Sequence, residues 1–90
     1  MTDIGKRIKQ LREERELSMD MAVADINQKF NLNPPFNKSM ISRWERQEGE
    51  PTLENARILS MYYDVSLDYL IGLIDVRTPS RLMKKPKEGK

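Results

Sequence analysis

Apolar residues recur at helical spacing in the first thirty residues of the chain. Ile4, Ile8 and Leu11 are four and three positions apart, so they share one face of a predicted helix that ends near Glu16. Ser18 can cap a second helix, because its hydroxyl can accept a hydrogen bond from a free backbone amide in the first turn. The apolar stripe of that second helix consists of Met19, Val23, Ile26 and Phe30.

The helical pattern breaks at residues 31–35 and then resumes. Pro34 and Pro35 lack backbone donors and disfavour helical backbone in the residue before them, so this stretch is predicted to be an irregular connection. Asn37 can cap a third helix over residues 38–46. The inward-facing residues of that helix are predicted to be Met40, Ile41 and Trp44.

Two more helices are predicted after Pro51. Thr52 can cap a fourth helix, and Ser66 can cap a short fifth helix over residues 67–71. Gly72 follows at a position where a left-handed residue commonly ends a helix. The chain is therefore predicted to be all-α, with five helices.

The length and composition indicate one small domain. Ninety residues can enclose only a single modest core. The absence of cysteine excludes disulfides and thiolate metal sites, and there is no histidine either. No stretch holds enough apolar residues to cross a bilayer or to form a signal peptide, so a cytoplasmic protein without membrane contact is expected.

The net charge of +2 is unevenly distributed along the chain. Residues 1–74 carry 10 Lys and Arg against 12 Asp and Glu, a net charge of 10 − 12 = −2. Residues 75–90 carry 6 against 2, a net charge of 6 − 2 = +4. The prediction is a helical domain over residues 1–74 and a basic, flexible tail over 75–90, which either adds nonspecific affinity for phosphates or packs back on the domain.

Three segments in the second half of the chain carry a family resemblance. They are 41–46 (ISRWER), 51–54 (PTLE) and 65–72 (VSLDYLIG). In this order and at this spacing they resemble the Xre family, the Cro and lambda-repressor-like helix-turn-helix regulators, and the resemblance covers residues 4–73. It implies a five-helix lambda-repressor-like domain that binds double-stranded DNA and regulates transcription.

The chain departs from the family pattern in two places. The connection between the second and third helices, residues 30–37, is longer than the family's tight turn and lacks its glycine. Either the second helix is extended by a turn, or a proline-bearing loop projects beside the DNA. Met19 stands where the family commonly has a glutamine that contacts a phosphate.

The third helix carries the candidate DNA-reading residues. Its predicted outward strip lies opposite Ile41 and Trp44 and consists of Lys38, Ser39, Ser42 and Arg43. By resemblance, these residues match positions that face bases in the major groove. The alternative is that the strip is only the solvated face of an ordinary helix.

Phosphate contacts are assigned to Lys38, to Arg46 and to the backbone amides near Thr52, because a helix N-terminus attracts anions. The alternative for Arg46 is a surface ion pair with Glu48 or Glu50.

Two further polar residues are assigned a structural role by the resemblance. Arg12 and Glu45 match family positions that pair between the first and third helices, so a salt bridge is expected to set the angle of the third helix. Trp44 is assigned to the core, and the late tyrosines to packing rather than to stacking on bases.

A single recognition helix covers few base pairs, so a homodimer on a palindromic operator is expected. The expected interface follows family usage of the fifth helix and the residues after it. It consists of Leu67, Leu70, Ile71, Leu73 and Ile74, with Val76 a further candidate. The alternative is that these residues only close the core of the monomer.

Other classes of protein fit the sequence less well. Without histidine or cysteine, and with carboxylates on solvated faces, the sequence predicts no catalytic residue, no cofactor, no metal site and no small-molecule substrate. The main alternative is a protein-interaction module or an antitoxin-like protein that uses the same fold to bind a partner protein. Between repression and activation, repression is favoured because a bare DNA-binding unit can block polymerase by occupying its site.

Overall fold

The computed structural model describes residues 3–77, and these residues form five helices and no strand. The helices are α1 (Ile4–Glu14), α2 (Met19–Phe30), α3 (Lys38–Glu45), α4 (Leu53–Tyr63) and α5 (Leu67–Leu70). The predicted all-α class and the number of helices are confirmed. The predicted tail beyond residue 77 lies outside the described residues.

Short polar side chains start four of the five helices. Ser18, Asn37, Thr52 and Ser66 each accept a hydrogen bond from the backbone amide three residues later, at 2.9–3.1 Å. Asp3 stands at the N-cap of α1 but makes no such side-chain bond. Four helices therefore begin at the capping residues that the sequence predicted.

Three helices end earlier than predicted, and one of them is α3, which ends at Glu45 rather than at residue 46. α1 ends at Glu14 because Glu16 takes a left-handed conformation and the amide of Leu17 bonds to the carbonyl of Arg12, which turns the chain toward α2. α5 ends at Leu70, and Gly72 adopts the expected left-handed conformation with φ = 89°.

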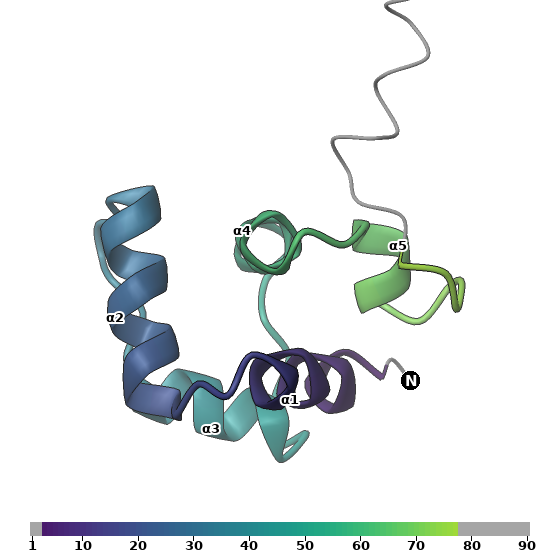
Figure 1. The fold of residues 1–90 in the computed structure, drawn as a ribbon, viewed down its shortest axis with the longest axis horizontal. Helices are drawn as coiled ribbons and strands as arrows, with labels where there is room; N and C mark the ends of the chain where they lie inside the picture. The colour runs from purple at the N-terminus through teal and green to yellow at the C-terminus, as the bar shows by residue number, and fades with distance from the viewer. Residues whose placement is uncertain (1–2, 78–90) are drawn as a thin grey trace, which may run out of the picture.

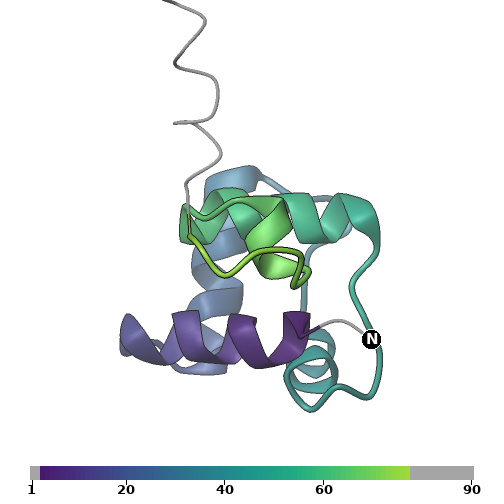
Figure 2. The ribbon, with the colours of Figure 1, turned by 90° about the vertical axis from the view of Figure 1, so that its right-hand side faces the viewer.

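The helices pack around α1. Helix α1 contacts α3, α4 and α5, while α2 packs against α3 and α4 packs against α5. Figures 1 and 2 show α3 at the edge of the molecule, beside α1 and one end of α2, with no helix covering its outer side. No helix within residues 3–77 has the length and apolar character that a bilayer crossing requires.

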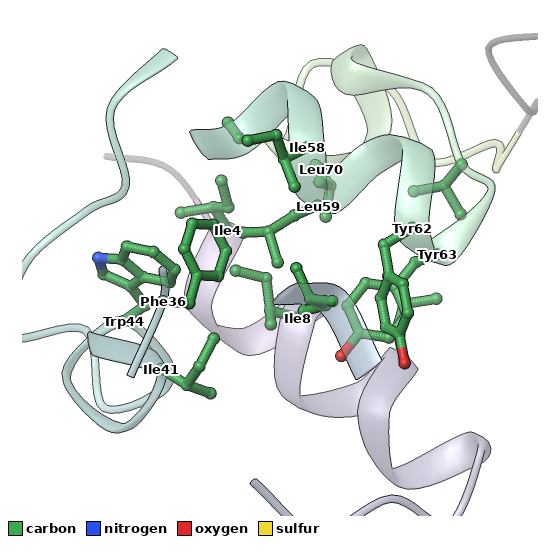
Figure 3. Close-up of a cluster of buried hydrophobic side chains, with 14 of the residues drawn as sticks. Ile4, Ile8, Phe36, Ile41, Trp44, Ile58, Leu59, Tyr62, Tyr63 and Leu70 are labelled. Carbon is green, nitrogen blue, oxygen red and sulfur yellow. The ribbon is translucent and has the colours of Figure 1, made fainter. Parts of the chain in front are cut away.

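The core is a single cluster that joins all five helices and the connection before α3 (Figure 3). Ile8, Ile26, Ile41, Leu59 and Leu70 are fully buried at its centre. Tyr62, Tyr63 and Tyr69 are also buried, in agreement with their predicted role in packing.

The close approach of α1 and α3 depends on Gly5. A Cβ atom at this position would overlap the carbonyl oxygen of Trp44 and lie 3.0 Å from its carbonyl carbon. Any larger residue would therefore push α3 away from α1.

The segment after α5 is fastened to α1 by two arginines. Arg7 donates to the carbonyls of Tyr69 and Ile74 and to the carboxylate of Asp75, at 2.6–2.9 Å. Arg77 forms a bidentate pair with Glu14, with both distances 2.8 Å, and also donates to the hydroxyl of Tyr69. Residues 75–77, which the prediction assigned to the tail, thus contact α1 and α5.

Candidate nucleic-acid interface

The inner side of α3 is held by a buried salt bridge and by the core. Arg12 Nε lies 2.7 Å from Glu45 Oε2, and Arg12 Nη2 lies 2.9 Å from Glu45 Oε1. The same guanidinium donates to the carbonyl of Leu17 at 2.6 Å, so it joins α1, the α1–α2 turn and α3. The hydrogen bonds that Arg12 donates to Glu45 raise the pKa of Arg12. This is the salt bridge that the family resemblance implied.

Apolar residues hold the same side of α3 in place. Ile41 and Trp44 are buried, at 1% and 6% exposure, and the Trp44 ring packs edge-on against Phe36 with centroids 5.3 Å apart. Tyr63 lies nearby, and its burial together with the charge of Glu45 raises its pKa to about 12. Trp44 therefore anchors α3 from within, as predicted, and is not available to stack on a base.

The long connection between α2 and α3 is an ordered part of this arrangement. Helix α2 continues to Phe30, and Asn31 ends it in a left-handed conformation. The side-chain amide of Asn27 accepts from the backbone amide of Phe36 at 2.8 Å and donates to its carbonyl at 2.9 Å. Of the two open alternatives, the structure shows the extended second helix, since α2 reaches residue 30 before the proline-bearing connection begins.

The outer side of α3 carries the four predicted base-reading residues. Lys38, Ser39 and Arg43 are exposed, and Ser42 is half-buried. Together with Arg46 they line one surface hollow of about 310 Å³. The structure therefore brings the predicted strip together on an open face.

The cations at the two ends of this hollow are paired with acids. Lys38 Nζ lies 3.7 Å from Asp20 Oδ2, in the first turn of α2. At the other end, Arg46 Nη2 lies 2.9 Å from Glu48 Oε1, and Arg46 Nη1 donates to Ser42 Oγ at 2.7 Å. The hydrogen bond from Arg46 holds the pKa of Glu48 below its usual range. The surface ion pair considered for Arg46 is therefore present in the protein alone.

Thr52, the third predicted phosphate contact, is exposed at the start of α4 and is not among the residues that line the hollow. Its hydroxyl oxygen accepts the capping bond from the amide of Asn55. Because this bond uses the hydroxyl oxygen only as an acceptor, the Thr52 O–H can still donate to a phosphate, beside the backbone amides of the first turn of α4.

The predicted interface residues fall into three groups. Leu70 is fully buried in the core of the domain, so it has no surface to offer a partner and the expectation for this residue is corrected. Leu67 and Ile71 are half-buried against the core. Leu73 and Ile74 are 70% and 38% exposed, and Val76 beside them is 62% exposed.

Sequence reasoning missed two residues that shape this site. Phe36 precedes the cap of α3, and an apolar residue at that position often packs against the first turns of the helix, so its burial had a local signal. Asp20 has no comparable signal, because its partner Lys38 lies on a different helix. No group of three or more potential metal ligands gathers within residues 3–77.

Comparisons with known proteins agree with this geometry. Residues 36–70 match the family model described as helix-turn-helix. The chain is also similar to the uncharacterized HTH-type transcriptional regulator YobD of Bacillus subtilis (strain 168). The two are 32% identical over 83 residues, which cover 92% of this chain and 67% of that relative. No solved structure matches the chain.

Proposed function

Because the chain belongs to the Xre and lambda-repressor-like family of helix-turn-helix DNA-binding transcriptional regulators, we propose that it is a repressor that binds a palindromic operator as a homodimer. The observation that carries this proposal is the outer side of α3. It offers cations and hydroxyls from one exposed strip, while the inner side is fixed by the core and a buried salt bridge.

Base reading is assigned to Lys38, Ser39, Ser42 and Arg43. Lys38 and Arg43 supply donors that suit the N7 and O6 acceptors of guanine, whereas the serine hydroxyls accept or donate. Arg46, Lys38 and the backbone amides after Thr52 supply the phosphate contacts. This division places specificity on α3 and orientation on the ends of α3 and α4.

The homodimer is supported by the exposed apolar residues after α5. Leu73, Ile74 and Val76 lie in a segment that Arg7 and Arg77 fasten to the domain, so a partner would meet a preformed surface. A second copy of the chain would place a second α3 on the other half of a palindrome. Leu73→Ser/Val76→Ser should shift sedimentation from dimer toward monomer and should leave the helix content unchanged, as measured by circular dichroism.

Repression needs only that the DNA-binding domain occupies its site. A bound dimer excludes polymerase from a promoter that overlaps the operator, and this mechanism needs binding alone rather than catalysis.

The proposal is tested by titrating duplex DNA at several salt concentrations. Lys38 and Arg46, the two side chains assigned to phosphates, predict a log–log slope of about −1.8 per subunit, on the scale of about 0.9 per phosphate neutralised. Binding without salt dependence, or no binding at 50 mM salt, would contradict it. The protein-interaction alternative would then be tested by co-purification with a partner protein.

A further inference from the structure

The DNA-facing hollow of α3 is bounded at each end by an acid. Asp20 faces Lys38 at the start of α3, and Glu48 faces Arg46 just after its end. Both acids and both cations are more than half exposed as side chains, so these pairs lie in the surface that a duplex would cover.

The two acids reduce the positive charge that the hollow presents to a phosphate backbone. Nonspecific DNA binding comes almost entirely from cations that displace counterions from phosphates. A carboxylate within 4 Å of such a cation cancels much of its field at the distance of a phosphate. Residues 1–74 carry a net charge of −2, so the domain as a whole adds no net positive charge to that of the hollow.

The same pairs leave Lys38 able to contact a base and hold Arg46 in place beside the base-reading strip. The ammonium of Lys38 has three donors, so it can keep Asp20 as a partner and still donate to a guanine acceptor. Arg46 is held by Glu48 through one terminal nitrogen and by Ser42 through the other, which fixes its guanidinium against the base-reading strip.

We propose that Asp20 and Glu48 are positioning residues that set DNA specificity, by holding Lys38 and Arg46 over the hollow and by suppressing their attraction to random phosphates. This inference rests on the proposed function, since it assigns a role within the same DNA-binding surface. It predicts that the two acids lower affinity for random DNA much more than affinity for the operator.

The test compares Asp20→Asn/Glu48→Gln with the wild type on two duplexes, one selected by the wild type from a random pool and one of scrambled sequence. Loss of one exposed ion pair changes an equilibrium constant by up to about fivefold. With both acids removed, affinity for the scrambled duplex should therefore rise about tenfold at 50 mM salt. Affinity for the selected duplex should change less than about threefold, and the salt slope on the scrambled duplex should steepen.

The matched control is Glu13→Gln/Asp68→Asn, which changes net charge equally on α1 and α5. Asp68 occupies the same first-turn position of α5 that Asp20 occupies in α2, so any loss of helix stability is reproduced. This control should keep the discrimination of the wild type. Glu48→Gln alone provides a second test, since it leaves α2 intact.

The outcomes distinguish a wrong proposed function from a wrong inference about Asp20 and Glu48. If the wild type binds no duplex in a salt-dependent way, the proposed function is wrong. If the wild type prefers its selected duplex but the Asp20/Glu48 variant discriminates as well as the control variant, only the inference about the acids is overturned.

Discussion

The two sides of α3 differ in residue composition and in what surrounds them. Inward, Ile41, Trp44 and Glu45 are buried and each has its place in the core or in the salt bridge to Arg12. Outward, Lys38 and Arg43 are exposed and lie on the wall of an open hollow.

Within the eight residues of α3, the inner side contributes to folding stability and the outer side is assigned to DNA recognition. The inner side presents the helix at a fixed angle, because α1 contacts it through Gly5 and Arg12. The outer side contributes little to folding, because exposed ion pairs are worth at most about 1 kcal/mol. Changes on the inner side should therefore unfold the protein, and changes on the outer side should alter DNA binding alone.

The largest effect is expected from breaking the buried salt bridge. Arg12→Ala leaves the Glu45 carboxylate, whose side chain is 2% exposed, without its cation and should cost about 3–5 kcal/mol of unfolding free energy in urea denaturation. Arg12→Met/Glu45→Leu removes both charges at similar volume and should recover most of that loss. Equal losses in the single and double variants would show that the charge left unpaired is not the cause.

The next largest effect is expected at Gly5. Alanine gains about 1 kcal/mol in helix propensity, but its Cβ would overlap the Trp44 carbonyl at an overpacking cost of about 3 kcal/mol. Gly5→Ala should therefore lose about 2 kcal/mol. Gly49→Ala is the control, because the Cβ atom added there meets only Arg43 Nη2, at 3.7 Å. This variant should melt at the same temperature as the wild type.

The smallest effect is expected from lowering the pH, which weakens the ion pair between Arg46 and Glu48. The hydrogen bond from Arg46 lowers the pKa of Glu48. The contribution of this ion pair to folding stability is therefore fully present above the usual pKa of glutamate and is lost as the pH falls through the lowered pKa. An NMR titration of the Glu48 carboxyl should show this low pKa, and Arg46→Ala should return it to the usual range. An unchanged Glu48 titration in that variant would rule out Arg46 as the cause.

The sequence predicted the features that local chemistry decides. The caps at Ser18, Asn37, Thr52 and Ser66 needed only a short polar side chain before a helical pattern, and all four form. The inward phase of Trp44 followed from its spacing to Ile41 on the same helix.

Features that depend on the tertiary fold were harder to predict. The apolar pattern after residue 66 does not distinguish a core from an interface, so Leu70 was assigned to a partner although it is buried within the domain. The two hydrogen bonds between the Asn27 side chain and the Phe36 backbone, and the ion pair between Asp20 and Lys38, join separate elements, and no periodicity reveals them. The Arg12–Glu45 salt bridge spans 33 residues and was expected only through the family resemblance.

The most direct test of the division between the two sides is the Lys38→Ala/Arg43→Ala variant. Removing two base contacts should weaken binding to the selected duplex by about 2 kcal/mol or more, which is about thirtyfold, while the unfolding free energy stays within about 0.5 kcal/mol of the wild type. A variant that binds the selected duplex as tightly as the wild type would contradict the assignment of DNA reading to the outer side of α3.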